Sequence, residues 1–249
     1  MNIDLSERSY LYNRDFVAFP KGKRLIRLIA GNGIFIVGRI IQGRDEFIRV
    51  GARLEYVNPN QLLPWSELYD YRPGVVLSGS KIPYELILTA KGFFRAVCDR
   101  YKDSEAMLQI LYSSTSDEWM FRPLRQEVTP ATVKSFLGNE KIPDGFLAVG
   151  VIHSHGLASA FHSQIDDKSE LPLDGVYITL GRVAEPNLDM SVSVVIMGVR
   201  FLLSSSDLIE IPDAVSAFPK TWIRYVTKGQ IPALFEETGD QKEFMYGQE

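Results

Sequence analysis

The sequence predicts an α/β protein in which a small β-rich N-terminal domain precedes a layered α/β domain. Three observations support this fold class. The first part of the chain is dominated by short apolar runs of strand-like composition. A helical period begins after Pro83, and strand-like and helix-like segments alternate from there onward. We place the domains at residues 1–78 and 79–235, followed by a polar C-terminal tail at residues 236–249.

The N-terminal domain is predicted from a hairpin signal. The apolar runs at residues 24–30 and 33–41 flank Asn32-Gly33, and Asn-Gly between two such runs is typical of a tight β-turn. Residues 47–57 continue the strand pattern. Turn-forming residues then become frequent up to Gly79, which sets the boundary near residue 78.

The second domain opens with a predicted helix. Apolar residues recur at steps of three or four and form one face, namely Leu86, Ala90, Phe93, Val97 and Tyr101. Cys98 lies in this helix, and we interpret it as a structural, partly buried thiol. Strands are predicted over residues 106–113 and 119–124, with a polar turn between them.

The remaining elements follow from caps and apolar runs. Thr129-Pro130 has the composition of an N-cap and first helical residue, and Gly138 suits the end of a helix, so residues 130–137 predict a short helix. Buried strands are predicted over three further runs, at residues 146–152, 176–180 and 191–203.

Composition limits the chemistry. The 249 residues include one cysteine and three histidines, which excludes disulfides, thiolate-rich zinc sites and iron–sulfur clusters held by the chain's own thiolates. The formal net charge of −4 gives no reason to expect nucleic acid or an anionic membrane as a partner. We find no targeting signal or membrane-spanning run in the sequence, and we expect a cytoplasmic protein.

All three histidines lie in one stretch, GVIHSHGLASAFHSQIDD, at residues 150–167. Side chains alternate along a strand, so His153 and His155 lie on the same side of an extended segment and can reach one metal ion. Asp166 could supply a third ligand. Two imidazoles and one carboxylate leave a position for water, which is typical of a catalytic zinc site.

Simpler interpretations of the same residues exist. A lone His-x-His is not a specific motif. Ser163 and Asp166 also have the spacing of a capping box at a helix start. The two interpretations are compatible, because a helix start can direct a carboxylate back toward the end of a strand.

The joint spacing resembles a known family. His153-x-His155, seven residues, Ser163, two residues and Asp166 is similar to the JAMM motif of MPN (JAB) domain metalloproteases. The resemblance covers roughly residues 80–205. It implies a cytidine-deaminase-like α/β fold with a mixed sheet flanked by helices. It also implies one Zn²⁺ per chain, bound by His153, His155 and Asp166, with Ser163 near the oxyanion of the substrate.

The motif also requires a glutamate between the first helix and the following strand, and Glu105 occupies that position. Its role would be to take a proton from water and pass it to the leaving amine. The competing glutamates are at a helix start (Glu85), in a turn (Glu118) and before the Thr-Pro pair (Glu127). In its simpler interpretation, Glu105 is a solvated acid in a polar break.

Some positions depart from the family pattern. Gly156 and His162 stand where many members have proline, and the glycines that often follow the family's glutamate are absent. These changes put the subfamily and the substrate in doubt, but they alter no ligand. We interpret His162 as a polar surface residue, with a position in the cleft as the alternative. Residues 170–181 and the N-terminal β region are similar to prokaryotic JAB proteins, including PRTRC system protein A.

The resemblance implies a zinc-dependent isopeptidase or peptidase, similar to a deubiquitinase. Its substrate would be a ubiquitin-like protein or its conjugates, and activating-like and conjugating-like enzymes would be partners. Two alternatives stay open, a protease that processes a sulfur-carrier protein and a non-catalytic MPN scaffold. Cytidine-deaminase chemistry requires thiolate ligands, and a single cysteine excludes it.

Overall fold

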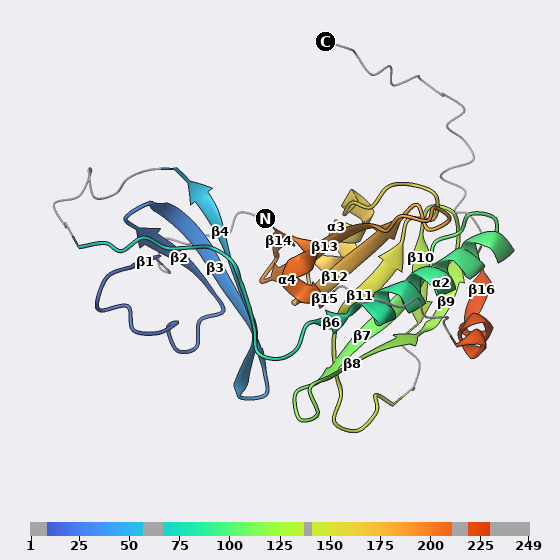
Figure 1. Cartoon of the computed structure of the whole chain (residues 1–249), viewed down its shortest axis with the longest axis horizontal. Coiled ribbons are helices and arrows are strands. Elements are labelled where there is room, and N and C mark those ends of the chain that lie inside the picture. Colours follow the sequence, from blue (N-terminus) through green and yellow to red (C-terminus); the bar gives the residue numbers. More distant parts are fainter. Residues whose placement is uncertain (1–8, 57–66, 137–140, 211–218, 230–249) are drawn as a thin grey trace, which may run out of the picture.

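A computed structural model describes residues 9–56, 67–136, 141–210 and 219–229. The fold is mixed α/β, with many strands and few helices, as the sequence predicts at this level (Figure 1). No helix within these ranges combines the length and the apolar composition that crossing a bilayer requires. The predicted tail at residues 236–249 lies outside the described residues.

An N-terminal sheet has the strand order β1-β2-β3-β4-β5. Its strands are β1 (Ser9–Leu11), β2 (Leu25–Ala30), β3 (Gly33–Gln42), β4 (Asp45–Glu55) and β5 (Val75–Leu77). The predicted hairpin is confirmed, because β2 and β3 pair antiparallel with Ala30 opposite Gly33. Gly33 has a φ of +151°, and a Cβ there would lie 2.7 Å from the Glu55 carbonyl oxygen. The turn therefore requires glycine at this position.

The larger sheet has the strand order β14-β13-β12-β11-β7-β8. Its strands are β7 (Met107–Ser113), β8 (Glu118–Pro123), β11 (Leu147–Ser154), β12 (Gly175–Gly181), β13 (Asp189–Ile196) and β14 (Val199–Leu203). Strands β11 and β12 are parallel, and the other neighbours are antiparallel. The helix α3 (Gln164–Glu170) lies in the connection between the two parallel strands. This connection carries the histidine-rich segment.

The predicted long helix is α2 (Tyr84–Arg100), which crosses the larger sheet in Figure 1. It buries Ile87, Thr89, Ala90, Phe93, Phe94, Val97 and Cys98. The predicted face is confirmed at its centre, whereas Leu86 and Tyr101 are only half-buried. Burial raises the pKa of the Cys98 thiol to about 11, which suits a structural role.

The predicted helix at residues 130–137 is wrong. Residues Val133–Phe136 form strand β10, which pairs antiparallel with β9 (Arg125–Val128). The Thr129 hydroxyl accepts hydrogen bonds from the amides of Ala131 (3.3 Å) and Thr132 (3.0 Å), so it closes a tight turn. A threonine side chain can cap a helix or close a turn through the same hydrogen bonds. Here the residues after the turn pair with the edge of β9 and so form a strand instead of a helix. Strand β16 (Val226–Lys228) covers the other edge of β9.

Four short elements complete the described chain. They are β6 (Ile82–Pro83), α4 (Ser205–Leu208), β15 (Ile209–Glu210) and the 3₁₀-helix η2 (Lys220–Tyr225). Strands β6 and β15 pair with each other, which joins the start of α2 to the segment after β14.

One hydrophobic core joins the two sheets. It contains side chains from the larger sheet and from one face of the N-terminal sheet, the latter being Leu25, Ile36, Phe47, Ile48 and Val50. The opposite face of the N-terminal sheet has a smaller core of Ile26, Leu28, Ala30, Phe35 and Val37. The ring of Phe47 lies 5.3 Å from that of Tyr112 and 5.9 Å from that of Trp119, centroid to centroid.

Candidate metal centre

The end of strand β11 positions the first two candidate ligands. His153 pairs with Thr179 of β12 and with Met107 of β7, so neighbours on both sides fix its backbone. The Ser154 side chain points the other way and accepts a hydrogen bond from the Ala106 amide at 3.0 Å. His153 and His155 are both buried on the same side, as the alternation of the strand predicts.

Three side chains, those of His153, His155 and Asp166, direct their ligand atoms at one position at the end of this strand, which we call the convergence point. His153 Nε2 lies 3.3 Å from His155 Nε2 and 3.4 Å from Asp166 Oδ1. His155 Nε2 lies 3.3 Å from Asp166 Oδ2. Ligands at 2.0–2.1 Å from a tetrahedral zinc ion are about 3.3 to 3.4 Å apart. The donor set and its spacing therefore fit a metal ion of this kind, and the group could hold one.

Asp166 reaches this point through a helix cap. Ser163 is the N-cap of α3, and its hydroxyl accepts a hydrogen bond from the Asp166 amide at 3.2 Å. The Ser163 amide in turn donates to Asp166 Oδ2 at 2.7 Å. This capping box is the one that the sequence predicts. It holds the carboxylate toward the two imidazoles, so the cap and the candidate ligand are the same side chain.

The loop between His155 and Ser163 is held against the end of β12. Amides of Arg182 and Val183 donate to the carbonyls of Ala158 (2.7 Å) and Gly156 (3.0 Å). The Ser159 carbonyl lies 3.3 Å from His155 Nδ1. These contacts give the imidazole a defined orientation, with Nε2 directed at the convergence point.

Charge is strongly coupled at the convergence point. Burial opposes ionisation of Asp166, but the two imidazoles and the Ser163 side chain outweigh it and hold its pKa well below the usual range. Burial also opposes protonation of His155, yet Asp166 and Glu105 raise its pKa. A cation binding here would compete with protons on the imidazoles.

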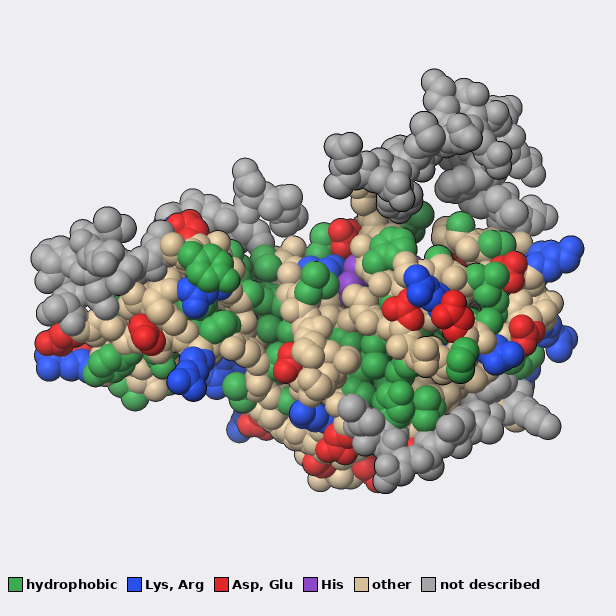
Figure 2. Space-filling model, turned by 45° about the horizontal axis from the view of Figure 1, so that its top comes forward, with side chains coloured by type: hydrophobic (Ala, Val, Ile, Leu, Met, Phe, Trp, Pro, Cys, Tyr) green, Lys and Arg blue, Asp and Glu red, His purple; other side chains and the backbone are tan. Residues whose placement is uncertain are grey.

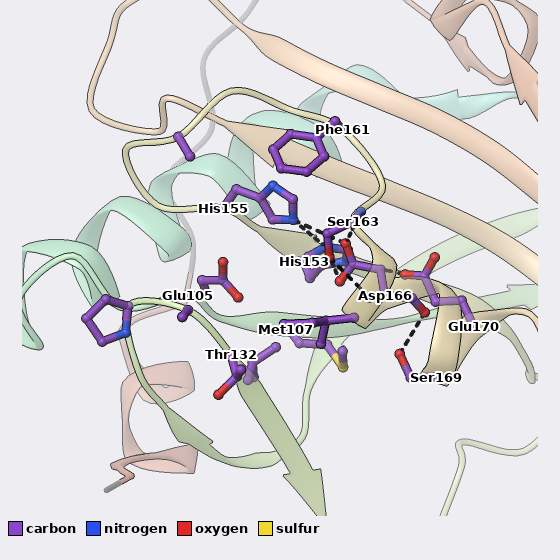
Figure 3. Close-up of a pocket in the computed structure, with 15 residues that line it drawn as sticks. Glu105, Met107, Thr132, His153, His155, Phe161, Ser163, Asp166, Ser169 and Glu170 are labelled. Atoms are coloured by element: carbon purple, nitrogen blue, oxygen red, sulfur yellow. Dashed lines mark hydrogen bonds and ion pairs between the residues drawn. The ribbon is translucent and has the colours of Figure 1, made fainter. Parts of the chain in front are cut away.

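Glu105 lies across the same cavity. It follows α2, its amide donates to the Thr129 carbonyl at 2.9 Å, and its side chain faces the candidate ligands (Figure 3). Burial raises the pKa of this carboxyl to about 7, partly offset by His155 and His153. A pKa near neutrality suits a group that accepts and returns a proton.

The other glutamates considered do not line this cavity. Glu85 is in the first turn of α2, Glu118 begins β8, and Glu127 is exposed on β9. Among the four glutamates that the sequence offered, Glu105 in the polar break after α2 is therefore the one that lines the cavity.

The cavity has a volume of about 230 Å³ and a mixed lining. Its apolar wall is formed by Met107, Pro130, Ala131, Val133, Ala158, Phe161 and Ile165. Phe161 packs edge-on against His155, with ring centroids 4.7 Å apart. Figure 2 shows histidine only as a small purple area among the surrounding side chains, in keeping with the burial of these rings.

The structure corrects the interpretation of His162. Its side chain is only 3% exposed, so it is not a polar surface residue. Its Nδ1 lies 3.3 Å from Thr179 Oγ1 and 3.6 Å from Glu170 Oε2. His162 precedes the N-cap of α3, and the turn into that helix directs the ring inward, behind the candidate ligands.

Sequence reasoning also missed Glu170 and Arg200. Glu170 is buried on α3, 3.6 Å from His153 Nδ1, and Arg200 Nη2 donates to it at 2.8 Å. One signal was available, because Asp166 and Glu170 are four residues apart and so share a face of the helix. Arg200 comes from β14, and no local spacing connects it to this site.

Comparisons with known proteins assign no family. No family model matches the chain, and no curated protein matches it. Among solved structures, the solution structure of protein DSY2949 from Desulfitobacterium hafniense aligns with 54% of this chain and 93% of its own. The identity is 13% and the TM-score is 0.34, values at which the alignment supports no functional inference.

Proposed function

We propose that this protein is a zinc-dependent peptidase or isopeptidase built on an MPN (JAB) domain. The observation that carries the proposal is the convergence of His153, His155 and Asp166, with Glu105 facing them across one cavity. The pattern of two histidines and one carboxylate is that of a catalytic zinc site with room for water. A bound zinc ion would lower the pKa of a water molecule and polarise a carbonyl.

The chain's own residues would handle the protons. Glu105 would take a proton from the attacking water and return it to the nitrogen of the leaving amine. Its pKa near 7 favours both halves of that exchange. The Ser163 hydroxyl accepts a hydrogen bond from the Asp166 amide, and its own hydrogen would turn from the Asp166 carboxylate to the developing oxyanion.

The substrate we propose is the extended C-terminal tail of a ubiquitin-like protein. Strand β10 is an edge of the sheet β10-β9-β16, and its first residue, Val133, lines the cavity together with the preceding Thr132. An edge strand can bind an extended peptide through main-chain hydrogen bonds. The tail would then enter the cavity beside the candidate ligands.

The proposal is tested on the purified protein by measuring its zinc content and its cleavage of a fusion. In this fusion, a second protein follows the C-terminal tail of a ubiquitin-like protein. We expect the wild type to bind one zinc ion and to cleave the fusion. Glu105→Gln should keep the zinc and lose about 10²- to 10⁴-fold in rate, because it removes the proton carrier alone. His155→Ala should lose both zinc and cleavage.

Glu127→Gln is the matched control, because it makes the same chemical change on an exposed part of β9. A wild type without zinc would overturn the proposal. Full activity in Glu105→Gln would show that another group carries the proton. A fusion of a sulfur-carrier protein, assayed in parallel, tests the alternative substrate. The chemistry of cleavage is the same for both, so the faster cleaved fusion identifies the substrate class.

A further inference from the structure

We infer that Glu170 is a positioning residue that selects the metal-binding tautomer of His153, and that Arg200 holds Glu170 in place. This inference rests on the metal site proposed above and goes beyond it. In the view of Figure 3, Glu170 lies on the far side of His153 and Asp166 from Glu105. Glu170 lines the same cavity, but its Oε1 lies beside His153 Nδ1, the ring nitrogen that is turned away from the convergence point.

The two ring nitrogens of each histidine face different surroundings. Both rings direct Nε2 at the convergence point, and a neutral imidazole that binds metal through Nε2 must carry its proton on Nδ1. For His155, the acceptor behind Nδ1 is the Ser159 carbonyl at 3.3 Å. For His153, it is the carboxylate of Glu170, whose Oε1 lies 3.6 Å away.

The His153–Glu170 distance is longer than a hydrogen bond, and His153 Nδ1 has no hydrogen-bonding partner among the described residues. Both side chains are buried, at 3% and 5% exposed. A buried ring N–H requires a hydrogen-bond acceptor, and the carboxylate oxygen Oε1 of Glu170 already faces it. A small ring rotation that closes this gap fixes the proton on Nδ1 and leaves the Nε2 lone pair for a metal.

Arg200 holds the Glu170 carboxylate in place through a charge-assisted hydrogen bond. Its Nη2 donates to Glu170 Oε2 at 2.8 Å, which leaves Oε1 for His153. The guanidinium is itself held by Asp167 Oδ1 (2.8 Å from Nη2) and by Ser193 Oγ (2.7 Å from Nη1). A planar guanidinium fixed at several points gives the carboxylate one orientation.

A purely structural role is the competing explanation, because Arg200 also ties α3 to the sheet. The two roles use different acids. Asp167 contributes only to the tie, and its side chain is 42% exposed. Glu170 alone also faces the ligand. Comparing the two acids therefore separates positioning from tethering.

The test uses the full chain with Glu170→Gln, and with Asp167→Asn as the matched control. A glutamine can offer its oxygen to Arg200 or to His153 but not to both. We expect the affinity for Zn²⁺, measured by competition with a chelator, to fall about 10- to 100-fold in Glu170→Gln. Asp167→Asn should lose much less.

A second readout needs no metal. Long-range proton–nitrogen NMR of the metal-free protein reports which ring nitrogen of each histidine is protonated, and the chain has only three histidines. Glu170→Gln should reduce the Nδ1–H form of His153 and leave His155 unchanged. His155 is an internal control, since its acceptor is a backbone carbonyl.

The outcomes are distinguishable. A wild type that binds no zinc overturns the proposed function, while the tautomer of His153 still decides this inference. Unchanged zinc affinity together with an unchanged His153 tautomer in Glu170→Gln overturns the inference. Equal losses in Glu170→Gln and Asp167→Asn also overturn it. If Glu170→Gln does not fold, Arg200→Lys should shift the His153 tautomer, and an unchanged tautomer there overturns the inference.

Discussion

Glu105 is a carboxyl group whose protonation is linked to folding. Burial raises its pKa to about 7 from an ordinary value of 4.5. The folded chain therefore holds this proton at pH values where the unfolded chain has released it. Stability from this group is fully present below pH 4.5 and is lost as the pH rises to about 7.

We predict that Glu105→Gln stabilises the metal-free protein at pH 8 and has little effect at pH 4. Glutamine stays neutral, so it avoids the penalty of a buried charge. The expected gain in the free energy of unfolding at pH 8 is roughly 1 to 3 kcal/mol. Denaturant unfolding in the presence of a chelator, at both pH values, measures it. Equal effects at the two pH values would contradict the raised pKa.

At the scale of elements, the end of β12 supports the loop that carries Phe161. A Cβ at Gly181 would overlap the backbone of Ser159 and Ala160 and would lie 2.7 Å from the Ala158 carbonyl oxygen. Backbone atoms cannot move aside as the tip of a side chain can. Glycine at this position thus permits the close approach that places the Ser159 carbonyl behind His155.

We predict that Gly181→Ala weakens metal binding through this loop. The added methyl should displace residues 158–160 and withdraw the acceptor from His155 Nδ1. We expect zinc affinity to fall about 10-fold or more, with a loss of roughly 1 to 3 kcal/mol in stability. Chelator competition and thermal unfolding measure these changes. Gly74→Ala is the control, since no atom lies within 4 Å of its added Cβ. Wild-type affinity in Gly181→Ala would show that the loop does not support the ligand.

Elements differ in how well local sequence predicted them. Helix α2 and the β2–β3 hairpin were predictable, because a long apolar period and an Asn-Gly turn specify them locally. Strand β10 was not, because its four residues gain their structure from pairing with β9. Short segments of this kind follow the partner that the fold offers them.

At the scale of the whole molecule, the N-terminal sheet is part of the main hydrophobic core. Phe47 is 3% exposed and packs against Tyr112 and Trp119 of the larger sheet. Arg24 and Asp174 form an ion pair between the two parts at 2.6 Å. Removing residues 1–78 would therefore expose apolar surface of the larger sheet.

We predict that the two parts unfold together. Phe47→Ala should cost roughly 3 to 5 kcal/mol, because it leaves a cavity in the shared core. Calorimetry should show one transition, shifted to lower temperature. Val17→Ala is the control, since Val17 is 89% exposed. Two separate transitions would show that the sheets are independent folding units.

The sequence by itself determined the candidate ligand set and the helix cap that directs it. His153, His155, Ser163 and Asp166 lie within one short segment, where strand alternation and helix capping relate side chains through local geometry. Glu105 required in addition the resemblance to a known motif. Only the tertiary structure brought Glu170, Arg200 and the ring of His162 behind the site. Their contacts join α3, β12 and β14, and the packing of strands distant in sequence sets those distances.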